Sequence, residues 1–398
     1  MNVRILVPLL YLLVGTTDIL NFWQNSGFSQ DEIDYTKGTI IISFLGNILL
    51  SIACISLLKN RTLTKKAMIK DIAIIIVFLY LFTSCFWSPF FFVSIRKFIK
   101  LIGLYIMLLY NQVGVKEPRD NLNKMMAYYF IIAAISSLFL IIIFPQWGYM
   151  PYDGSVLPKG IFGHKNQFGA FAAFFFLWFL YGKPRYKNLF LVLCFLILII
   201  SRASGALISL CITIFISSLI LFIFSKKFNI NNNLKITILW ICTACLCAYF
   251  LIIGFNLDPT SYILTLFNKD ISLTGRVDLW PILFSYGLGH HPILGSGYES
   301  FFLESNVAWI TRSLGWVALN AHNGLLHIFL NNGIIGVVLI SWLLFRTMVS
   351  NLVNKDYRNI YILIFFILCN ISEATLFRAY FIFFTFLITC RRCKYESI

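Results

Sequence analysis

Apolar blocks of about 20 residues recur along the whole length of this chain, and a block of that length crosses the hydrocarbon core of a bilayer as one α-helix. Hydrophobic residues make up 59% of its 398 residues and charged residues only 12%. Charged residues make up about 25% of a typical soluble globular protein. The sequence therefore predicts an all-α, polytopic integral membrane protein.

The polar segments between these blocks are short and contain no recognisable binding module. Because a bundle of spanning helices packs as one unit, we expect residues 1–398 to form a single integral membrane domain. The longest segment outside the blocks, 256–322, is expected to form one large loop. The twelve predicted transmembrane helices are 5–23, 39–58, 69–88, 95–113, 125–145, 166–182, 188–203, 205–224, 236–255, 323–346, 359–373 and 376–390.

The positions of Lys and Arg predict how the chain crosses the membrane, because short cytoplasmic loops retain positive charge. With both termini in the cytoplasm, roughly two thirds of the basic residues fall on the cytoplasmic side. The opposite side then carries most of the acidic residues, including Asp258, Glu299 and Glu304. We therefore expect cytoplasmic termini and place the loop 256–322 on the outer face.

The formal net charge of +16 does not by itself indicate nucleic acid, because that interpretation needs a basic patch on one soluble face. Here the cations are spread among short loops, and no nucleic-acid partner is expected. The chain also lacks the glycine motifs of nucleotide-binding loops, a His-Glu-x-x-His motif and a Gly-x-Ser-x-Gly motif. Nucleotide-driven and metalloprotease chemistry are therefore disfavoured.

Several cations break the charge rule by standing on the outer side. Arg202 lies near the outer end of an apolar block, and Arg276 and Arg312 lie in the large loop. A cation near hydrocarbon needs a reason such as an anionic ligand, and a guanidinium offers paired donors that match phosphate oxygens. For any single one of them the alternative is a solvated side chain that reaches the membrane surface.

A second group of polar residues, His164, Lys165 and Asn166, stands where an outer loop enters the predicted span 166–182. Free backbone N–H groups and the positive end of the helix dipole favour anions there. These residues therefore predict a place for a phosphate or for sugar hydroxyls. The alternative is an interfacial anchor in which Asn166 caps the helix.

The segment from Ser272 to His322 holds most of the unusual residues outside the apolar blocks. Arg276 opens a run that predicts a short helix on the membrane surface, and a glycine-rich turn follows. Adjacent His290 and His291 point in different directions and have no carboxylate at ligand spacing, so we expect no metal site.

His322 and Asn323 begin the next predicted span from the outer side. A neutral imidazole can accept a proton from a hydroxyl group. A lone histidine is more often a capping or hydrogen-bonded structural residue, but the same topology places His164, Arg202 and Arg276 on the same face. We therefore expect His322 to be part of a functional site together with them.

At these residues the chain resembles the O-antigen ligase and O-antigen polymerase superfamily of bacterial membrane glycosyltransferases, and it is most similar to the exopolysaccharide polymerase branch. The matching stretches are Gly160-Ile-Phe-Gly-His-Lys-Asn-Gln-Phe-Gly169, Ser201-Arg-Ala-Ser204, Leu273-Thr-Gly-Arg-Val-Asp-Leu-Trp280, His291-Pro-Ile-Leu-Gly-Ser-Gly-Tyr298, Ala321-His-Asn-Gly324 and Gly333-Ile-Ile-Gly336.

The resemblance implies a GT-C-like fold of about 12 transmembrane helices with one large periplasmic loop, in the bacterial inner (cytoplasmic) membrane. It implies metal-independent, inverting transfer of a glycan carried on undecaprenyl diphosphate, with no cofactor and a periplasmic active site. Arg202 and Arg276 map to the diphosphate-binding arginines, and His322 maps to the histidine that activates the acceptor hydroxyl. We expect the remaining substrate-binding residues to be His164, Lys165, Asn166, Arg312 and Asn323.

The expected partners are an undecaprenyl-diphosphate-linked oligosaccharide, the lipid bilayer and a chain-length regulator. A ligase that transfers the glycan to lipid A core or to a protein is the alternative to a polymerase. A transporter or flippase of the lipid-linked sugar is an alternative of another class, although such proteins tend to show internal repeats. Asp18, Glu373 and Arg378 have no assigned role, and we expect Glu373 and Arg378 to pair.

Overall fold

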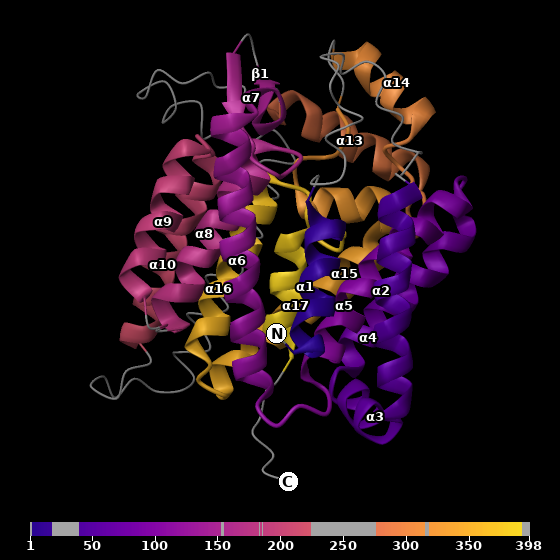
Figure 1. The fold of residues 1–398 in the computed structure, drawn as a ribbon. Coiled ribbons are helices and arrows are strands. Elements are labelled where there is room, and N and C mark those ends of the chain that lie inside the picture. The colour runs from indigo at the N-terminus through magenta and orange to yellow at the C-terminus, as the bar shows by residue number, and fades with distance from the viewer. Residues whose placement is uncertain are drawn as a thin grey trace.

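The computed structural model describes residues 2–17, 40–152, 155–182, 184, 186–223, 276–314 and 318–391. Long helices stand side by side in a bundle, and the α13–α14 pair lies across one end of it (Figure 1). The helices are α1 (Val3–Thr16), α2 (Ile40–Lys59), α3 (Arg61–Lys70), α4 (Ile72–Ser84), η2 (Cys85–Trp87), α5 (Phe91–Gln112), α6 (Pro118–Ile143), α7 (Pro145–Gly148), α8 (Lys165–Gly182), α9 (Lys187–Ile200), α10 (Ser204–Ile223), α13 (Arg276–His290), α14 (Glu304–Leu314), α15 (Gly324–Val353), α16 (Tyr357–Ser372) and α17 (Phe381–Cys390).

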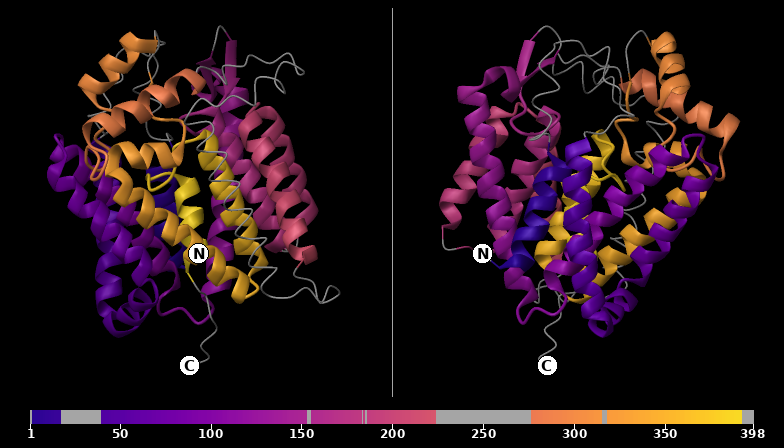
Figure 2. Two further views of the ribbon diagram at one scale, coloured as in Figure 1. Left: turned by 180° about the vertical axis from the view of Figure 1, so that it is seen from behind. Right: turned by 45° about the vertical axis from the view of Figure 1, so that its right-hand side comes forward.

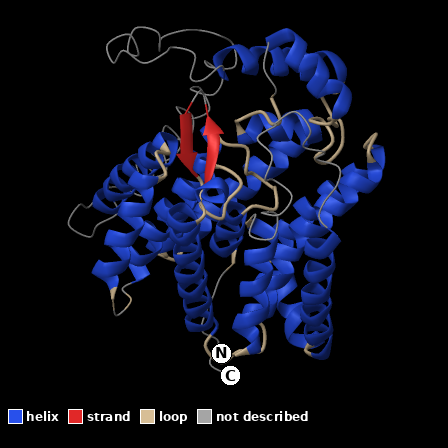
Figure 3. Ribbon diagram, turned by 45° about the horizontal axis from the view of Figure 1, so that its top comes forward, coloured by secondary structure: helices blue, strands red, loops and turns tan. Residues whose placement is uncertain are grey.

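The described residues confirm the predicted all-α class. Helices overlap every predicted apolar block except 236–255, which lies outside the described residues together with Asp18 and the first part of the large loop. One antiparallel hairpin interrupts the pattern, with strands β1 (Tyr149–Tyr152) and β2 (Ser155–Pro158) that pair Tyr149 with Pro158. Figure 3 shows this hairpin at the same end of the bundle as α13.

Three described helices, α2, α6 and α15, are long and apolar enough to cross a membrane. A fourth span is possible if α3 and the α4–η2 segment count as one, although they meet at an angle of 87°. Five further apolar helices, among them α9 and α17, have 10–17 residues. Twelve complete spans and a periplasmic loop therefore stay predictions.

The core of the bundle is aromatic and is built around α8. All of its phenylalanines except the half-buried Phe176 are buried, as expected for a helix that is apolar all round. Phe175 packs against Phe130 of α6 at a centroid distance of 5.0 Å and against Phe381 of α17 at 5.5 Å. Tyr129 stacks on Phe381 at 4.8 Å. This packing fixes the first residues of α8 and α17, which both border the candidate site.

Hydrogen bonds tie together the helix ends at the end of the bundle opposite α13 (Figure 1). An amino group of Arg4, at the start of α1, donates to the carbonyl oxygen of Tyr110 in α5 at 2.9 Å. Arg391, after α17, lies 2.9 Å from the carboxylate of Asp71, which precedes α4. The start of α1 and the end of α17 therefore lie at the same end of the bundle.

Helix α15 breaks at Gly333, whose φ of 63° and ψ of −169° are not helical. Figure 2 shows the two parts of α15 running in different directions. The break leaves carbonyl groups of the helix without their usual N–H partners. Backbone N–H groups of the glycine-rich turn donate to them instead. The Ser296 N–H donates to the Leu330 oxygen at 3.0 Å, and the Gly297 N–H donates to the Asn331 oxygen at 2.8 Å. These two hydrogen bonds therefore anchor the predicted glycine-rich turn, and with it the loop that follows, to α15.

Gly333→Ala is expected to release this anchor. A methyl group at position 333 would lie 2.1 Å from the Ile293 oxygen, and this backbone region is open essentially to glycine alone. We expect a loss of about 1–3 kcal/mol of stability from the strain alone, seen as a lower melting temperature of the purified protein in detergent. Gly289→Ala in α13 is the control, because a methyl group there meets nothing within 4 Å. Equal melting temperatures for the two variants would contradict the anchor.

Candidate functional site

A cavity of about 120 Å³ lies at the end of the bundle that carries α13 and α14. Four parts of the chain form its walls: the end of α1, the start of α8, the segment before α15 and the segment between α16 and α17. Three of the residues predicted from the sequence line it together, namely His164, Asn166 and His322. Glu373 and Arg378 line it as well. The structure thus brings residues more than 150 positions apart in sequence into one polar pocket.

The start of α8 orients the first two of these residues. The helix begins at Lys165, so His164 rather than Asn166 occupies the capping position, and the alternative in which Asn166 caps this helix is wrong. The backbone N–H of Asn166 donates to Nδ1 of His164 at 3.1 Å, and Nδ1 is therefore unprotonated. The side-chain amide of Asn166 is left to donate to the Glu373 carboxylate at 2.6 Å.

His322 is held by contacts on both sides of its backbone. Its N–H donates to the side-chain oxygen of Asn320 at 2.8 Å. The carbonyl of the preceding Ala321 accepts from the indole of Trp280 in α13 at 2.8 Å. Helix α13, which starts with Arg276, therefore positions the segment that carries His322.

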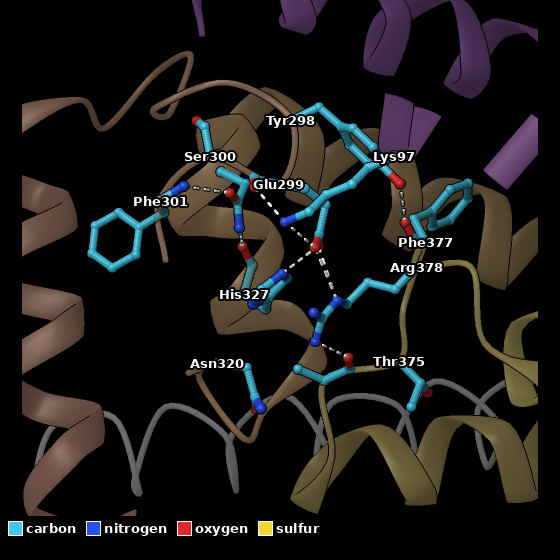
Figure 4. Close-up of polar contacts among 12 residues, drawn as sticks. Lys97, Tyr298, Glu299, Ser300, Phe301, Asn320, His327, Thr375, Phe377 and Arg378 are labelled. Atoms are coloured by element: carbon cyan, nitrogen blue, oxygen red, sulfur yellow. Dashed lines mark hydrogen bonds and ion pairs between the residues drawn. The ribbon is translucent and has the colours of Figure 1, made fainter. Parts of the chain in front are cut away.

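Arg378 reaches the cavity from the segment between α16 and α17, and it is held by Glu299 (Figure 4). The Arg378 Nε lies 3.1 Å from each oxygen of the Glu299 carboxylate. The same carboxylate accepts from Nε2 of His327 at 2.6 Å and lies 3.6 Å from the Lys97 ammonium group. The Glu299 side chain is only 8% exposed. One buried carboxylate thus joins the loop before α14 to α5, α15 and the α16–α17 connection.

Burial raises the pKa of the Glu299 carboxyl group, but Arg378, His327 and Lys97 together hold that pKa below its ordinary value. The folded pKa is depressed, so the ion pairs contribute stability that is fully present above the pKa of the unfolded chain. That stability is lost only as the pH falls through the folded pKa. Glu299 is therefore ionised throughout the neutral range and keeps Arg378 oriented there.

Backbone strain concentrates around this cavity. Among the described residues, five that are not glycine have a positive φ. Three of them line the cavity, contact a lining residue or stand beside one. His322 has a φ of 47°, Glu299 a φ of 53°, and Phe377, beside Arg378, a φ of 52°. Strained residues of this kind persist where the surrounding structure fixes them, commonly at functional sites.

Four predicted site residues whose side chains the structure describes do not line this cavity, and the side chain of Arg276 lies outside the described part of the chain. Asn323 is buried and caps α15 by accepting from the Leu326 N–H at 3.0 Å. Lys165 donates its backbone N–H to the sulfur of Met150. Arg312 is exposed in the last turn of α14. Arg202 is exposed in the turn between α9 and α10, and Arg276 is described only as the first residue of α13.

The roles of Arg378 and Glu299 in this site were missed in the sequence. Arg378 drew attention only as a charge without a role beside an apolar block, and we expected it to pair with Glu373. The structure gives it a different partner, Glu299, which is 79 positions away. Asn166 binds Glu373, and it is 207 positions away. No local pattern could have shown these pairs.

Metal ligands do not gather in the described part of the chain. No group of three or more His, Cys, Asp or Glu side chains there could hold a metal ion. His290, one of the two adjacent histidines, stacks on Tyr286 at 3.9 Å and contacts the carbonyl oxygen of the same residue through Nδ1.

The apolar helices and the polar cavity at one end of the bundle define the class of this molecule, a multi-pass membrane protein. Residues 189–341 match the family model described as O-antigen ligase. This match covers fewer than half of the residues, and it supports the resemblance to the O-antigen ligase and O-antigen polymerase superfamily of bacterial membrane glycosyltransferases. The matched region contains Arg202, Arg276 and His322. No curated protein matches the chain at a significant level.

Glu299→Gln is expected to destabilise the protein strongly, because it leaves Arg378 and Lys97 without the buried carboxylate. Removing one member of a buried ion pair costs about 3–5 kcal/mol, and we expect a lower melting temperature in detergent from neutral pH downwards. The difference from the original protein should shrink only below the ordinary Glu pKa of about 4.3.

The control for this change is Asp120→Asn. Asp120 pairs with Lys124 at 2.7 Å, but both side chains are exposed, and exposed pairs of this kind contribute little to stability. A Glu299→Gln protein as stable as Asp120→Asn at neutral pH would show that the buried cluster does not hold this end of the bundle together.

Proposed function

We propose that the protein polymerises exopolysaccharide or O-antigen repeat units that are linked to undecaprenyl diphosphate. The supporting observation is the cavity in which His322 meets Arg378 and the N-terminus of α8. A base and a fixed cation are groups that transfer of a sugar from a diphosphate requires. In this proposal the site faces the periplasm, the termini are cytoplasmic and the bilayer is the bacterial inner membrane.

The proposed reaction is one displacement at the anomeric carbon of the donor sugar. A hydroxyl oxygen of the acceptor sugar forms the new bond to that carbon and gives its proton to His322. The bond from the carbon to the diphosphate oxygen breaks, and undecaprenyl diphosphate leaves with the electron pair. Attack from the face opposite the leaving group inverts the configuration.

Fixed cations balance the charge that develops on the leaving diphosphate. The resemblance assigns Arg202 and Arg276 to this role, and the lining of the cavity adds Arg378. The charge is then balanced by guanidinium groups, so the proposed transfer is metal-independent. Glu299 acts as a positioning residue, because it fixes the Nε edge of Arg378 and leaves the other nitrogens for a ligand or for the Ala374 oxygen.

The remaining predicted residues are proposed to bind the substrate around this centre. His164 and Asn166 lie in the cavity wall, where they suit sugar hydroxyls. Lys165 and Arg312 would contact phosphate or sugar groups at its approaches. The side-chain oxygen of Asn323 is engaged in capping α15, so it contributes by fixing the backbone next to His322.

A ligase is the second candidate, because the matched family model is described as O-antigen ligase. The two reactions share the donor and differ in the acceptor. A polymerase adds to another lipid-linked repeat unit, and a ligase adds to lipid A core or to a protein. The product of the reaction therefore distinguishes a polymerase from a ligase.

The deciding experiment supplies purified protein with a defined undecaprenyl-diphosphate oligosaccharide and reads the products by mass spectrometry. We expect a ladder of longer lipid-linked oligosaccharides from the original protein and none from His322→Ala or Arg276→Ala. His290→Ala, which changes an exposed histidine at the end of α13, is the control and should keep the ladder. Glycan found only on an added lipid A core acceptor would identify a ligase, and no covalent product would point to transport.

The role of Arg378 is tested separately by comparing Arg378→Gln with Lys97→Gln. Each change removes one cation from Glu299 and leaves the other, so both variants disturb the buried cluster. Of these two residues, Arg378 lines the cavity and Lys97 does not. We expect kcat to fall about 100-fold or more for Arg378→Gln, as for the loss of one charge-stabilising donor, and much less for Lys97→Gln. Arg378→Lys should recover part of the loss.

Equal losses of activity in the two variants would assign Arg378 a purely structural role. The melting temperature of each variant, measured beside kcat, shows whether the protein in the assay is folded.

A further inference from the structure

Two turns at the α13–α14 end of the bundle lie against each other. One of them, residues 85–92, comprises η2 and the start of α5, and the other, residues 291–297, is the glycine-rich turn. A methyl group added at Gly297 would lie 2.6 Å from the Cα atom of Ser88, so the two backbones are in direct contact. We call the two turns together the apolar edge of the molecule.

Large apolar side chains of the apolar edge are exposed. In the first turn Phe92 is 84% exposed and Phe86 is 62% exposed. The ring of Phe91 lies between them, 5.7 Å from the Phe86 ring and 5.4 Å from the Phe92 ring. In the second turn Ile293 is 60% exposed, and Leu294 is exposed as well. Exposed apolar side chains that gather in this way mark a contact with another protein or with a membrane.

The backbone of the first turn is suited to an environment that is poor in water, because N–H groups at its bend bond within the protein. The Ser88 N–H donates to the Cys85 oxygen at 3.3 Å. The Phe90 N–H donates to the Ser88 hydroxyl oxygen at 3.1 Å, and that hydroxyl group lies 2.7 Å from the Ser94 hydroxyl group. Pro89 has no N–H to bond. No residue from 85 to 92 is charged.

The second turn is built in a similar way. Pro292 has no N–H, and its oxygen accepts from the Ile334 N–H at 2.9 Å. The Ile293 oxygen accepts from the Ile335 N–H at 3.4 Å. The two N–H groups that bond to the break of α15 add to these contacts. No residue from 292 to 298 is charged, so this turn gives up little when it leaves water.

The exposed face of α15 leads to the second turn. Ile335, Val338 and Trp342 are exposed and follow one another at three or four positions, so they share one side of the helix. This helix is one of the described helices that are long and apolar enough to cross a membrane. The backbone hydrogen bond between Ile335 and Ile293 puts the second turn at the end of this apolar stripe.

The exposed face of α4 leads to the first turn in the same manner. Ile76, Leu79 and Phe82 are exposed at the same helical spacing. The ring of Phe82 lies 5.3 Å from the ring of Phe86 in the first turn. Acyl chains that cover the exposed faces of α4 and α15 therefore reach the apolar edge without interruption.

We propose that the apolar edge lies in the membrane, at the boundary between the acyl chains and the headgroups of phospholipids on the α13–α14 side. Apolar segments at a membrane surface reach about 5–10 Å into this boundary. The continuity with α4 and α15 favours lipid over a partner protein as the occupant of this surface. The segment 291–297 belongs to the loop that the sequence places outside the membrane, so this loop is anchored in lipid rather than clear of it.

Both turns of the apolar edge are joined to the buried cluster around Glu299. Lys97 lies farther along α5 and donates to the Glu299 backbone oxygen at 3.1 Å. Glu299 itself follows the second turn and pairs with Arg378. The contact with lipid therefore fixes the depth of Arg378, and with it the candidate site, near the headgroups. This lipid contact does not depend on the proposed function.

Photo-crosslinking from the apolar edge tests the contact with the full-length protein in phosphatidylcholine liposomes. Phe92→p-benzoylphenylalanine and Ile293→p-benzoylphenylalanine replace exposed side chains, so both variants are expected to fold. After irradiation, mass spectrometry identifies the molecule that each position has bound. We expect phosphatidylcholine adducts at both positions, with the new bond near the glycerol group rather than at the end of an acyl chain.

Ser313→p-benzoylphenylalanine is the control. Ser313 is exposed in α14, which lies across the same end of the bundle (Figure 1), and it stands outside the apolar edge. We expect a loss of most lipid adducts at this position relative to Phe92.

Three outcomes would overturn the proposal. Lipid adducts at positions 92 and 293 that are no more frequent than at position 313 would leave the apolar edge without a particular contact with lipid. A covalent dimer of the chain as the main product would make the edge a contact between two copies. New bonds mainly at the ends of the acyl chains would place the edge in the middle of the bilayer.

A further variant tests whether the two turns enter the boundary as one unit. Phe92→Glu brings a charge to the first turn, and a charge near hydrocarbon is costly. Combined with the photo-reactive group at position 293, this change should reduce the lipid adducts of the second turn, whereas Phe92→Leu should keep them. An equal adduct yield from both combinations would refute a common apolar edge.

These measurements do not use polymerisation, so they separate the lipid contact from the proposed polymerase. A protein that gives the expected lipid adducts but forms no polymer would keep the apolar edge and refute the polymerase. Polymer formation without lipid adducts would do the reverse.

Discussion

The buried carboxylate of Glu299 is the contact on which the α13–α14 end of the molecule depends. Taking a carboxylate out of water costs several kcal/mol unless partners surround it, and here Lys97, His327 and Arg378 supply them. The partners come from α5, α15 and the α16–α17 connection, so one side chain fixes the mutual position of three parts of the bundle. The Tyr298 hydroxyl adds a hydrogen bond of 2.9 Å to the Phe377 oxygen. The Arg378 guanidinium, which borders the candidate site, is therefore held in place by its ion pair with Glu299.

Strain and close packing go together in this region. Non-glycine residues with positive φ are costly at about 1–3 kcal/mol each, and they stand here at Glu299, His322 and Phe377. The turn before Glu299 packs so closely against the break of α15 that a Cβ added at Gly333 would overlap backbone atoms of the turn. This close packing at Gly333 allows the strained residues to persist. His322 and Arg378 then line the same cavity.

Much of the fold could be predicted from the sequence because its signals are local. The blocks 188–203 and 205–224 correspond to α9 and α10, and the predicted surface helix after Arg276 is α13. The sequence also placed His164, Asn166 and His322 on one face, and they line one cavity. The helix start at Lys165 was missed, because His164 caps it through an imidazole nitrogen rather than through the usual oxygen. The apolar edge was missed too, because its two turns come from distant parts of the sequence.

By itself the sequence determined that this chain forms apolar helices, which part of it carries the unusual polar residues, and which superfamily it resembles. Those properties depend on runs of neighbouring residues, and a helix satisfies its backbone hydrogen bonds within its own segment. Only the tertiary structure decided which charges meet. Lys97 and Glu299 are 202 positions apart, and nothing in either neighbourhood specifies the other. Their contact exists because burial takes the Glu299 carboxylate out of water, so the packing of the helices selects its partner.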